Sequence, residues 1–381
     1  MRQVQLYDDR LDYEENKAKG PFGDYSKPTV YKNSGKPKYS FLDAAVYSNF
    51  GVSACPATMD SRYIKVMLDK GYDIVTCKTR RSKEVPANPF PQLLQLDLEG
   101  ALTEERFSEK IIGHHSKGYS QTNFNFANSF GNNCERPEVW TKDLAKLSQA
   151  VKPGQVLIAS VFGTLLSGMT TEEYHQDFAR TAELAVAAGI KVIELNLSCP
   201  NATNEGIVCY TEPAVVDICR RTRTVVGKNV KIIAKIGYYS ANQEELLTSI
   251  VKRTADLIDG FSAINTMPAT IVNKQGQQAF PGKGREKAGV SGSAIKWAGI
   301  DMTKRLNEIR KRLGLDFAII GIGGVMTVQD YQDYISAGAD AVQSATGAMW
   351  NPNLAAQIKE HLAGRPKPSR RGRRTAESYR R

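Results

Sequence analysis

Short apolar runs rich in β-branched residues alternate with longer helical patterns from about residue 41 onward. This alternation indicates repeated βα units, whose strands lie parallel in one sheet. Eight strands with intervening helices close naturally into a (β/α)8 barrel. The predicted strands span residues 45–49, 73–78, 156–161, 192–198, 231–236, 261–265, 318–322 and 341–345. We therefore expect an α/β fold of the TIM-barrel type.

The helical patterns between these runs carry recognisable start signals. The pattern at 171–188 follows Thr170, and Glu173 stands where the acidic residue of a capping box is expected. Further helices are predicted over 213–226 and 242–258. These lengths suit the outer ring of a barrel.

Two connections are too long for plain βα loops. They span about residues 79–154 and 266–293, and connections of this length are usually functional insertions. Residues 1–40 are polar and contain several Gly and Pro, so we expect an extension that packs on the outside of the barrel or is partly mobile. The chain then divides into this extension, a barrel over 41–364 and a tail over 365–381.

The net charge of +11 lies mostly in that tail. Residues 365–381 contain eight Arg or Lys and one Glu, and therefore supply +7 of the total. A charged segment with Pro and Gly and no apolar periodicity is expected to be disordered. A solvated tail is favoured over a contact with nucleic acid, although nucleic-acid binding through the tail stays open as a hypothesis of a different class.

The cysteines indicate neither a disulfide framework nor a metal site. The sequence holds six Cys without a CxxC pair, so we expect reduced thiols and no metal. No apolar run approaches the roughly 18 residues that a membrane-spanning helix needs. The first ten residues also lack the apolar core of a secretion signal. These features predict a cytoplasmic protein.

Polar side chains stand at predicted strand ends, which form the active face of a barrel. One run leads into Asn196, Cys199 and Asn201, which combine two amides with a thiol that can carry or take a proton. Lys78 and Lys235 close two other runs. A Lys within an apolar strand is costly unless an anion pairs with it. We therefore expect the strand ends to bind planar, polar and anionic groups.

Glycine-containing motifs end the last two predicted strands. They read Gly-Ile-Gly-Gly at 321–324 and Ala-Thr-Gly at 345–347. Glycine lets the backbone approach a phosphate closely, and a phosphate site after the last two strands is a recurrent feature of such barrels. Tight turns alone would explain an isolated motif, but two motifs at these positions favour a phosphate-bearing ligand.

The segment Asn-Leu-Ser-Cys-Pro-Asn at 196–201 resembles the active-site signature of the class 1 dihydroorotate dehydrogenases. In that family the Cys of the motif is the catalytic base, whereas the membrane-bound class 2 enzymes have Ser. The resemblance extends over about residues 41–362. It implies an FMN-dependent oxidoreductase of pyrimidine biosynthesis that converts dihydroorotate to orotate, with Cys199 taking a proton and FMN accepting the hydride.

The resemblance also implies binding positions, residue by residue. The family's cofactor positions match Gly51, Lys78, Thr79, Ser160, Asn196, Lys235, Gly292, Gly323, Gly324, Ala345 and Thr346. Its substrate positions match Lys78, Asn128, Phe130, Gly131, Asn132, Asn196, Asn201, Asn265 and Thr266.

Several positions depart from the family pattern. Phe130 and Asn132 replace residues that are usually aliphatic, Ala345 replaces a usual Gly, and Gln92 stands where a basic residue is common. The loop after Cys199 has no Lys, which the family often carries there. Another dihydropyrimidine is therefore an alternative substrate.

The resemblance leaves the electron acceptor open. Fumarate is one acceptor compatible with this chain, and a separate iron–sulfur and FAD partner that passes electrons to NAD is another. The family also implies a homo-oligomer, with a homodimer expected.

Overall fold

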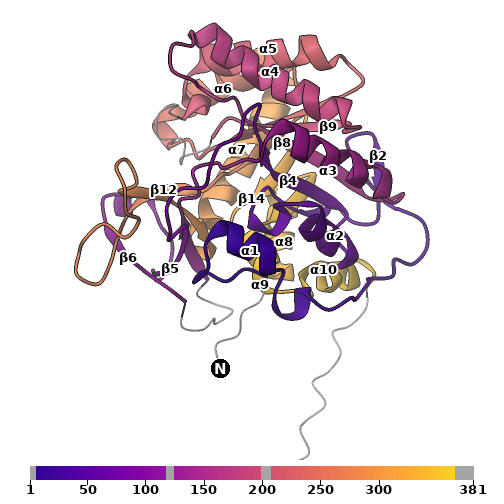
Figure 1. The fold of residues 1–381 in the computed structure, drawn as a ribbon. Coiled ribbons are helices and arrows are strands. Elements are labelled where there is room, and N and C mark those ends of the chain that lie inside the picture. The colour runs from indigo at the N-terminus through magenta and orange to yellow at the C-terminus, as the bar shows by residue number, and fades with distance from the viewer. Residues whose placement is uncertain (1–5, 117–123, 199–206, 365–381) are drawn as a thin grey trace, which may run out of the picture.

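Eight parallel strands close into a barrel at the centre of the molecule, seen in a computed structural model that describes residues 6–116, 124–198 and 207–364 (Figure 1). Each strand pairs with the next in chain order, and the last pairs with the first. The barrel strands are β3 (Phe50–Val52), β4 (Ile74–Arg80), β8 (Val156–Val161), β9 (Val192–Asn196), β10 (Lys231–Ile236), β11 (Gly260–Ala263), β14 (Ala318–Ile322) and β15 (Ala341–Ser344). The predicted (β/α)8 architecture is thus confirmed.

Helices surround the barrel and bury one face against it (Figure 1). The capping box expected before the helix at 171 is present, because the Thr170 side chain accepts a bond from the backbone N–H of Glu173 and the Glu173 side chain accepts one from the Thr170 N–H. The outer helices are α2 (Ser61–Asp69), α3 (Pro137–Ala150), α4 (Thr171–Ala187), α5 (Glu212–Val226), α6 (Glu244–Thr254), α7 (Lys296–Leu313), α8 (Val328–Ala337) and α10 (Leu354–Leu362), with the short α9 (Thr346–Trp350) after β15. No helix within the described ranges is long and apolar enough to cross a membrane.

The first predicted strand, 45–49, is wrong. Residues Ala44–Val46 form β2, which pairs antiparallel with β1 (Tyr39–Phe41) outside the barrel, and the barrel strand β3 begins only at Phe50. The apolar side chains of this hairpin cover the amino-terminal end of the barrel, where Phe41 and Val46 pack on barrel residues such as Ile74. The residues predicted as the first barrel strand therefore belong to the hairpin that closes the amino-terminal end of the barrel and to the turn after it.

The two long insertions pair with each other and form a second closed sheet, seen at the left of Figure 1. Sequence analysis predicted the insertions but not their pairing. The strands of this sheet are β5 (Leu93–Asp97), β6 (Lys110–His114), β7 (Asn125–Asn128), β12 (Met267–Val272) and β13 (Lys287–Gly292). The antiparallel pair β7–β13 joins Ala127 to Val290 across the two insertions.

The chain before the hairpin crosses the outside of the barrel and contains α1 (Tyr13–Lys19) (Figure 1). It is well packed, since Leu6, Tyr7, Tyr13 and Tyr25 are buried. The expectation for a disordered basic tail falls on residues 365–381, which lie outside the described residues.

Candidate active site

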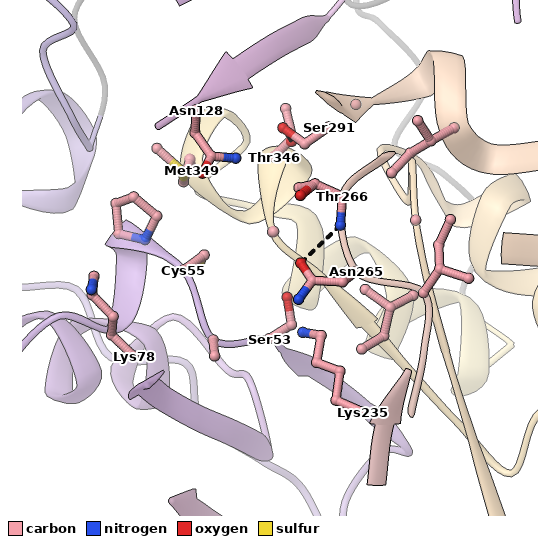
Figure 2. A pocket seen from close by; sticks show the side chains of 18 of the residues that line it. Ser53, Cys55, Lys78, Asn128, Lys235, Asn265, Thr266, Ser291, Thr346 and Met349 are labelled. Carbon is pink, nitrogen blue, oxygen red and sulfur yellow. Dashed lines mark hydrogen bonds between the residues drawn. The ribbon is translucent and has the colours of Figure 1, made fainter. Parts of the chain in front are cut away.

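The carboxyl ends of the barrel strands surround a pocket of about 1080 Å³, including its open mouth (Figure 2). The second sheet supplies part of its wall through β7 and β13. Most of the predicted site residues line this pocket: Lys78, Thr79, Asn128, Phe130, Asn132, Asn196, Lys235, Asn265, Thr266, Gly292, Gly323, Gly324, Ala345 and Thr346. Residues drawn from elements throughout the chain therefore meet at one place.

A chain of hydrogen bonds fixes the polar strand ends relative to one another. Asn196 Nδ2 donates to Thr79 Oγ1 over 3.0 Å, and Asn265 Nδ2 donates to Asn196 Oδ1 over 3.2 Å. The backbone N–H of Thr266 donates to Asn265 Oδ1 over 2.8 Å, and Figure 2 shows this bond. Behind them, Ser160 Oγ lies 3.0 Å from Thr79 Oγ1. The amide groups are thus oriented by the protein before a ligand binds.

Lys235 brings a buried positive charge to the pocket. Its side chain extends from β10, only 4% of the residue is exposed, and Figure 2 shows its amino group pointing toward Ser53 and Asn265. Among the described residues, no carboxylate forms an ion pair with Lys235. Because a buried cation without a counter-charge is costly, this part of the pocket suits an anionic or electron-rich ligand.

Lys78 reaches the opposite side of the pocket, as Figure 2 shows. Its Nζ donates to the backbone carbonyl of Asn133 over 2.9 Å, in the loop that follows β7. The two lysines therefore present positive charge from two separate sides of the cavity.

Glycines at the far wall allow the backbone to pack too closely for a side chain. Gly292 has φ of +109°, and a Cβ there would lie 1.8 Å from the carbonyl oxygen of Phe124. Gly324 has φ of +64°, and its Cβ would lie 2.8 Å from the carbonyl oxygen of Gly292. Only glycine tolerates both the left-handed backbone and this closeness. Thr346 Oγ1 lies beside them, 3.1 Å from Ser291 Oγ. Gly292, Gly323, Gly324 and Thr346 all line the pocket, and this glycine cradle presents backbone and hydroxyl groups that suit a phosphate.

The loop after β3 supplies pocket residues that the sequence analysis missed. Ser53 and Cys55 both line the pocket (Figure 2). They were overlooked because the strand before them was placed several residues too early. Burial raises the pKa of the Cys55 thiol to about 12, so this thiol is neutral and unsuited to act as a base near pH 7. Ser291, Ile295 and Met349 also line the cavity without having been predicted.

Three predicted positions lie behind the pocket wall. Gly51 is within β3, where a Cβ would lie 2.1 Å from the carbonyl oxygen of Ile74, so its glycine is required by strand packing. Ser160 does not line the pocket, but its Oγ lies 3.0 Å from Oγ1 of Thr79, which does. Gly131 adopts φ of +79° in the loop after β7, next to the Asn88 side chain.

Cys199 and Asn201 lie outside the described residues. The chain leading to them is anchored beneath the pocket, since Ser198 is buried and its Oγ donates to the carbonyl oxygen of Lys235 over 3.2 Å. The described part of the chain contains no group of His, Cys, Asp and Glu side chains that could hold a metal ion.

Comparisons with known proteins agree with this architecture. A model of the family described as "Dihydroorotate dehydrogenase" matches residues 59–365. A dihydroorotate dehydrogenase from Dictyostelium discoideum is 31% identical over 360 residues, which cover 92% of this chain and 95% of that protein. The catalytic subunit of dihydroorotate dehydrogenase B (NAD(+)) from Petrotoga mobilis is 34% identical over 275 residues, covering 72% of this chain and 82% of the relative.

A solved structure supports the fold alone. The structure of DHODH from Eimeria tenella in complex with ferulenol superposes with a TM-score of 0.67 at 17% identity, covering 90% of this chain and 87% of the other. The sequence matches cover most of the chain, so they support a family assignment that similarity of fold alone would not. On these grounds the chain belongs to the dihydroorotate dehydrogenase family of oxidoreductases.

Proposed function

We propose that this protein oxidises dihydroorotate to orotate, with FMN held at the carboxyl end of the barrel and Cys199 as the base. The observation that carries the proposal is the buried Lys235 without a carboxylate partner among the described residues, in a pocket that also contains a glycine cradle. A phosphate and an electron-rich ring on one ligand would satisfy both features.

The described residues fit FMN in two places. The backbone at Gly292, Gly323 and Gly324, with Thr346, would hold the phosphate. Lys235 would lie against the ring system, where a cation stabilises the negative charge of the reduced form. When bound, FMN supplies the acceptor for the hydride that leaves the substrate.

The substrate would be held by amide side chains. Asn128, Asn196 and Asn265 line the pocket, and amides can both donate to and accept from a pyrimidine ring that carries alternating N–H and C=O groups. Lys78 would face the substrate carboxylate. We place Asn201 in the same set from the sequence motif alone.

Oxidation requires that a proton leave C5 of the ring while a hydride leaves C6. A thiolate at Cys199 would take this proton, because an unperturbed thiol has a pKa near ~8.5, far below that of a hydroxyl. Cys55, which lines the pocket, cannot take this role, since burial raises its pKa to about 12 and keeps it protonated. In this proposal Cys199 supplies the base, and the amide side chains of the pocket orient the substrate ring.

We also propose a class 1 enzyme that is cytoplasmic and homodimeric. Two electron acceptors are compatible with the chain, namely fumarate and a separate electron-transfer subunit. The name of the Petrotoga mobilis relative, a catalytic subunit of an enzyme linked to NAD(+), supports the second.

Anaerobic titration tests the proposal. The purified protein should carry about one FMN per chain, and its flavin absorbance should bleach on addition of dihydroorotate. A panel of dihydropyrimidines without the carboxylate tests the alternative substrate raised by Phe130 and Asn132. A protein that cannot be loaded with flavin, or a flavin that another dihydropyrimidine bleaches much faster, would overturn the corresponding part of the proposal.

A further inference from the structure

The chain before the barrel makes a compact structure of its own over residues 6–25, which we name the N-terminal clamp. The buried side chain of Asn16 holds one turn of it, with Nδ2 donating to the carbonyl oxygens of Asp8, Leu11 and Asp12 at 2.8, 3.0 and 2.9 Å. Asp12 caps α1 in a capping box with Glu15. The clamp is thus internally ordered.

Bonds from three parts of the fold hold the clamp in place. The carboxylate of Asp9 is buried and accepts from Ser116 Oγ over 3.0 Å, at the end of β6. The hydroxyl of Tyr63 in α2 donates to the carbonyl oxygen of Asn16 over 2.7 Å. The hydroxyl of Tyr25 donates to the carbonyl oxygen of Ala348 in α9, the helix whose Thr346 and Met349 line the pocket. The clamp therefore spans the outer side of the candidate active site.

Two tyrosines of the clamp pack on a residue that lines the pocket. The rings of Tyr7 and Tyr13 meet the ring of Phe130 edge to face, with centroids 6.0 and 5.9 Å away and interplanar angles of 88° and 70°. Phe130 is 6% exposed and lies in the loop after β7. Edge-to-face packing is a preferred geometry of aromatic pairs, so both tyrosines favour this position of the Phe130 ring.

The same clamp also contacts Lys78. Its Nζ lies 5.3 Å from the centroid of the Tyr13 ring, within the range of a cation–π interaction, while it donates to the carbonyl oxygen of Asn133. Tyr13 thus contacts both Lys78 and Phe130, two residues that face the cavity from the barrel and from the inserted sheet.

We infer that Tyr13 is a positioning residue for substrate binding, which aims the ammonium group of Lys78 and the ring of Phe130 into the pocket. The inference rests on the proposed function for the identity of the substrate. The family model begins at residue 59, so this element lies outside the matched region. Phe130 and the clamp then form one unit, in which Tyr7 and Tyr13 pack against the Phe130 ring.

Substitutions at residue 13 test this role. Tyr13→Leu removes the ring and should raise KM for dihydroorotate about tenfold with kcat within about threefold, because a cation–π contact of this kind and the Phe130 packing act on binding. Tyr13→Phe keeps the ring and should restore the parental KM. Lys19→Ala, an exposed change on the same helix, is the matched control. Flavin content should be equal in all four proteins.

Hydrogen exchange across residues 124–134 provides a readout that does not depend on the substrate. Exchange should be faster in Tyr13→Leu than in the parent and Tyr13→Phe. If the parent does not oxidise dihydroorotate, the proposed function fails and hydrogen exchange alone decides the inference. An unchanged KM together with unchanged exchange in Tyr13→Leu, or an equal rise of KM in Lys19→Ala, would overturn it.

Discussion

The two ends of the barrel are built from the same strands and have opposite chemistry. At the amino-terminal end, inward residues such as Ile74 and Ile158 pack under Phe41 of the β1–β2 hairpin, which closes the barrel. At the carboxyl end, Lys78 and Ser160, on the same strands, belong to the polar site. The change from apolar to polar takes place within four residues of β4.

This difference separates stability from function along the strand axis. Apolar side chains such as Phe41, Ile74 and Ile158 pack together at the closed end, so this cluster contributes through hydrophobic burial. The open end keeps a buried cation and an ordered amide network at a cost to the free protein, which a bound ligand would offset. Substitutions at the two ends should therefore affect different measurements.

The largest effect is expected at the open end, from the thiol that we propose as the base. Cys199→Ala should slow flavin reduction by dihydroorotate by about 10²–10⁴-fold, the usual contribution of a general base. Cys55→Ala removes the other thiol near the pocket and should leave the rate within a fewfold of the parent, because that thiol is neutral. Stopped-flow reduction measures both.

The flavin should remain bound in Cys199→Ala, because the proposed FMN contacts come from other strand ends. Cys199→Ser should be slow and should gain rate toward higher pH, since a hydroxyl needs a stronger base to ionise. Equal rates for the parent and Cys199→Ala would exclude Cys199 as the base.

At the closed end, Phe41→Ala should lower the free energy of unfolding by about 3–5 kcal/mol, because it leaves a cavity where a 2% exposed ring was packed. Flavin content and kcat should not change, since the substitution lies at the other end of the barrel. Urea unfolding and steady-state assays measure the two effects. A loss of kcat in folded protein would show that packing at the closed end affects the chemistry at the open end.

Lys235→Met should weaken flavin binding without destabilising the flavin-free protein. Flavin affinity should fall about 100-fold, because the cation that faces the pocket is lost. The flavin-free protein should be equally or more stable, because a buried charge without a carboxylate partner among the described residues is removed. Isothermal titration with FMN and thermal unfolding without it test the two statements. A destabilised protein with parental flavin affinity would make Lys235 a structural residue.

The smallest expected effect concerns pH. Burial raises the pKa of Cys55 to about 12, while an unfolded thiol titrates near ~8.5. Above pH ~9 the unfolded chain releases this proton and the folded chain retains it, so stability falls as pH rises, by at most about 1.4 kcal/mol per pH unit for the thiol. Cys55→Ala should reduce the slope of unfolding free energy between pH 9 and 10 by about this amount. An unchanged slope would show that the thiol already ionises in the folded protein.

Much of the fold could be predicted because each barrel strand carries its own signal. Seven predicted strands overlap barrel strands, and Thr170 and Glu173 cap a helix as expected, since these features depend on neighbouring residues. The first strand failed because β3 has only three residues and includes Gly51, whereas the hairpin before it has the stronger apolar pattern. A short strand between partners is defined by tertiary pairing rather than by its own sequence.

The site was predictable where polar residues end apolar strands, as at Lys235 and Asn196. It was not predictable where the decisive contact joins distant segments. The sequence around Tyr13 does not indicate that Tyr13 packs on Phe130. Likewise, no sequence pattern in either insertion indicates that β7 pairs with β13. The family resemblance supplied positions such as Asn128 that the strand pattern alone would not have identified.

The pairing of β7 with β13 has a consequence for how the protein is made. Asn128 in β7 pairs with Gly289 in β13, so this pairing cannot form until β13 has been translated. In the same way, β3 cannot pair with β15, and the barrel cannot close, until β15 has been translated. During synthesis at the ribosome both edges are therefore exposed until most of the chain has been translated. Cofactor loading would then follow translation rather than accompany it, and the nascent chain would depend most on chaperones just before β15 emerges.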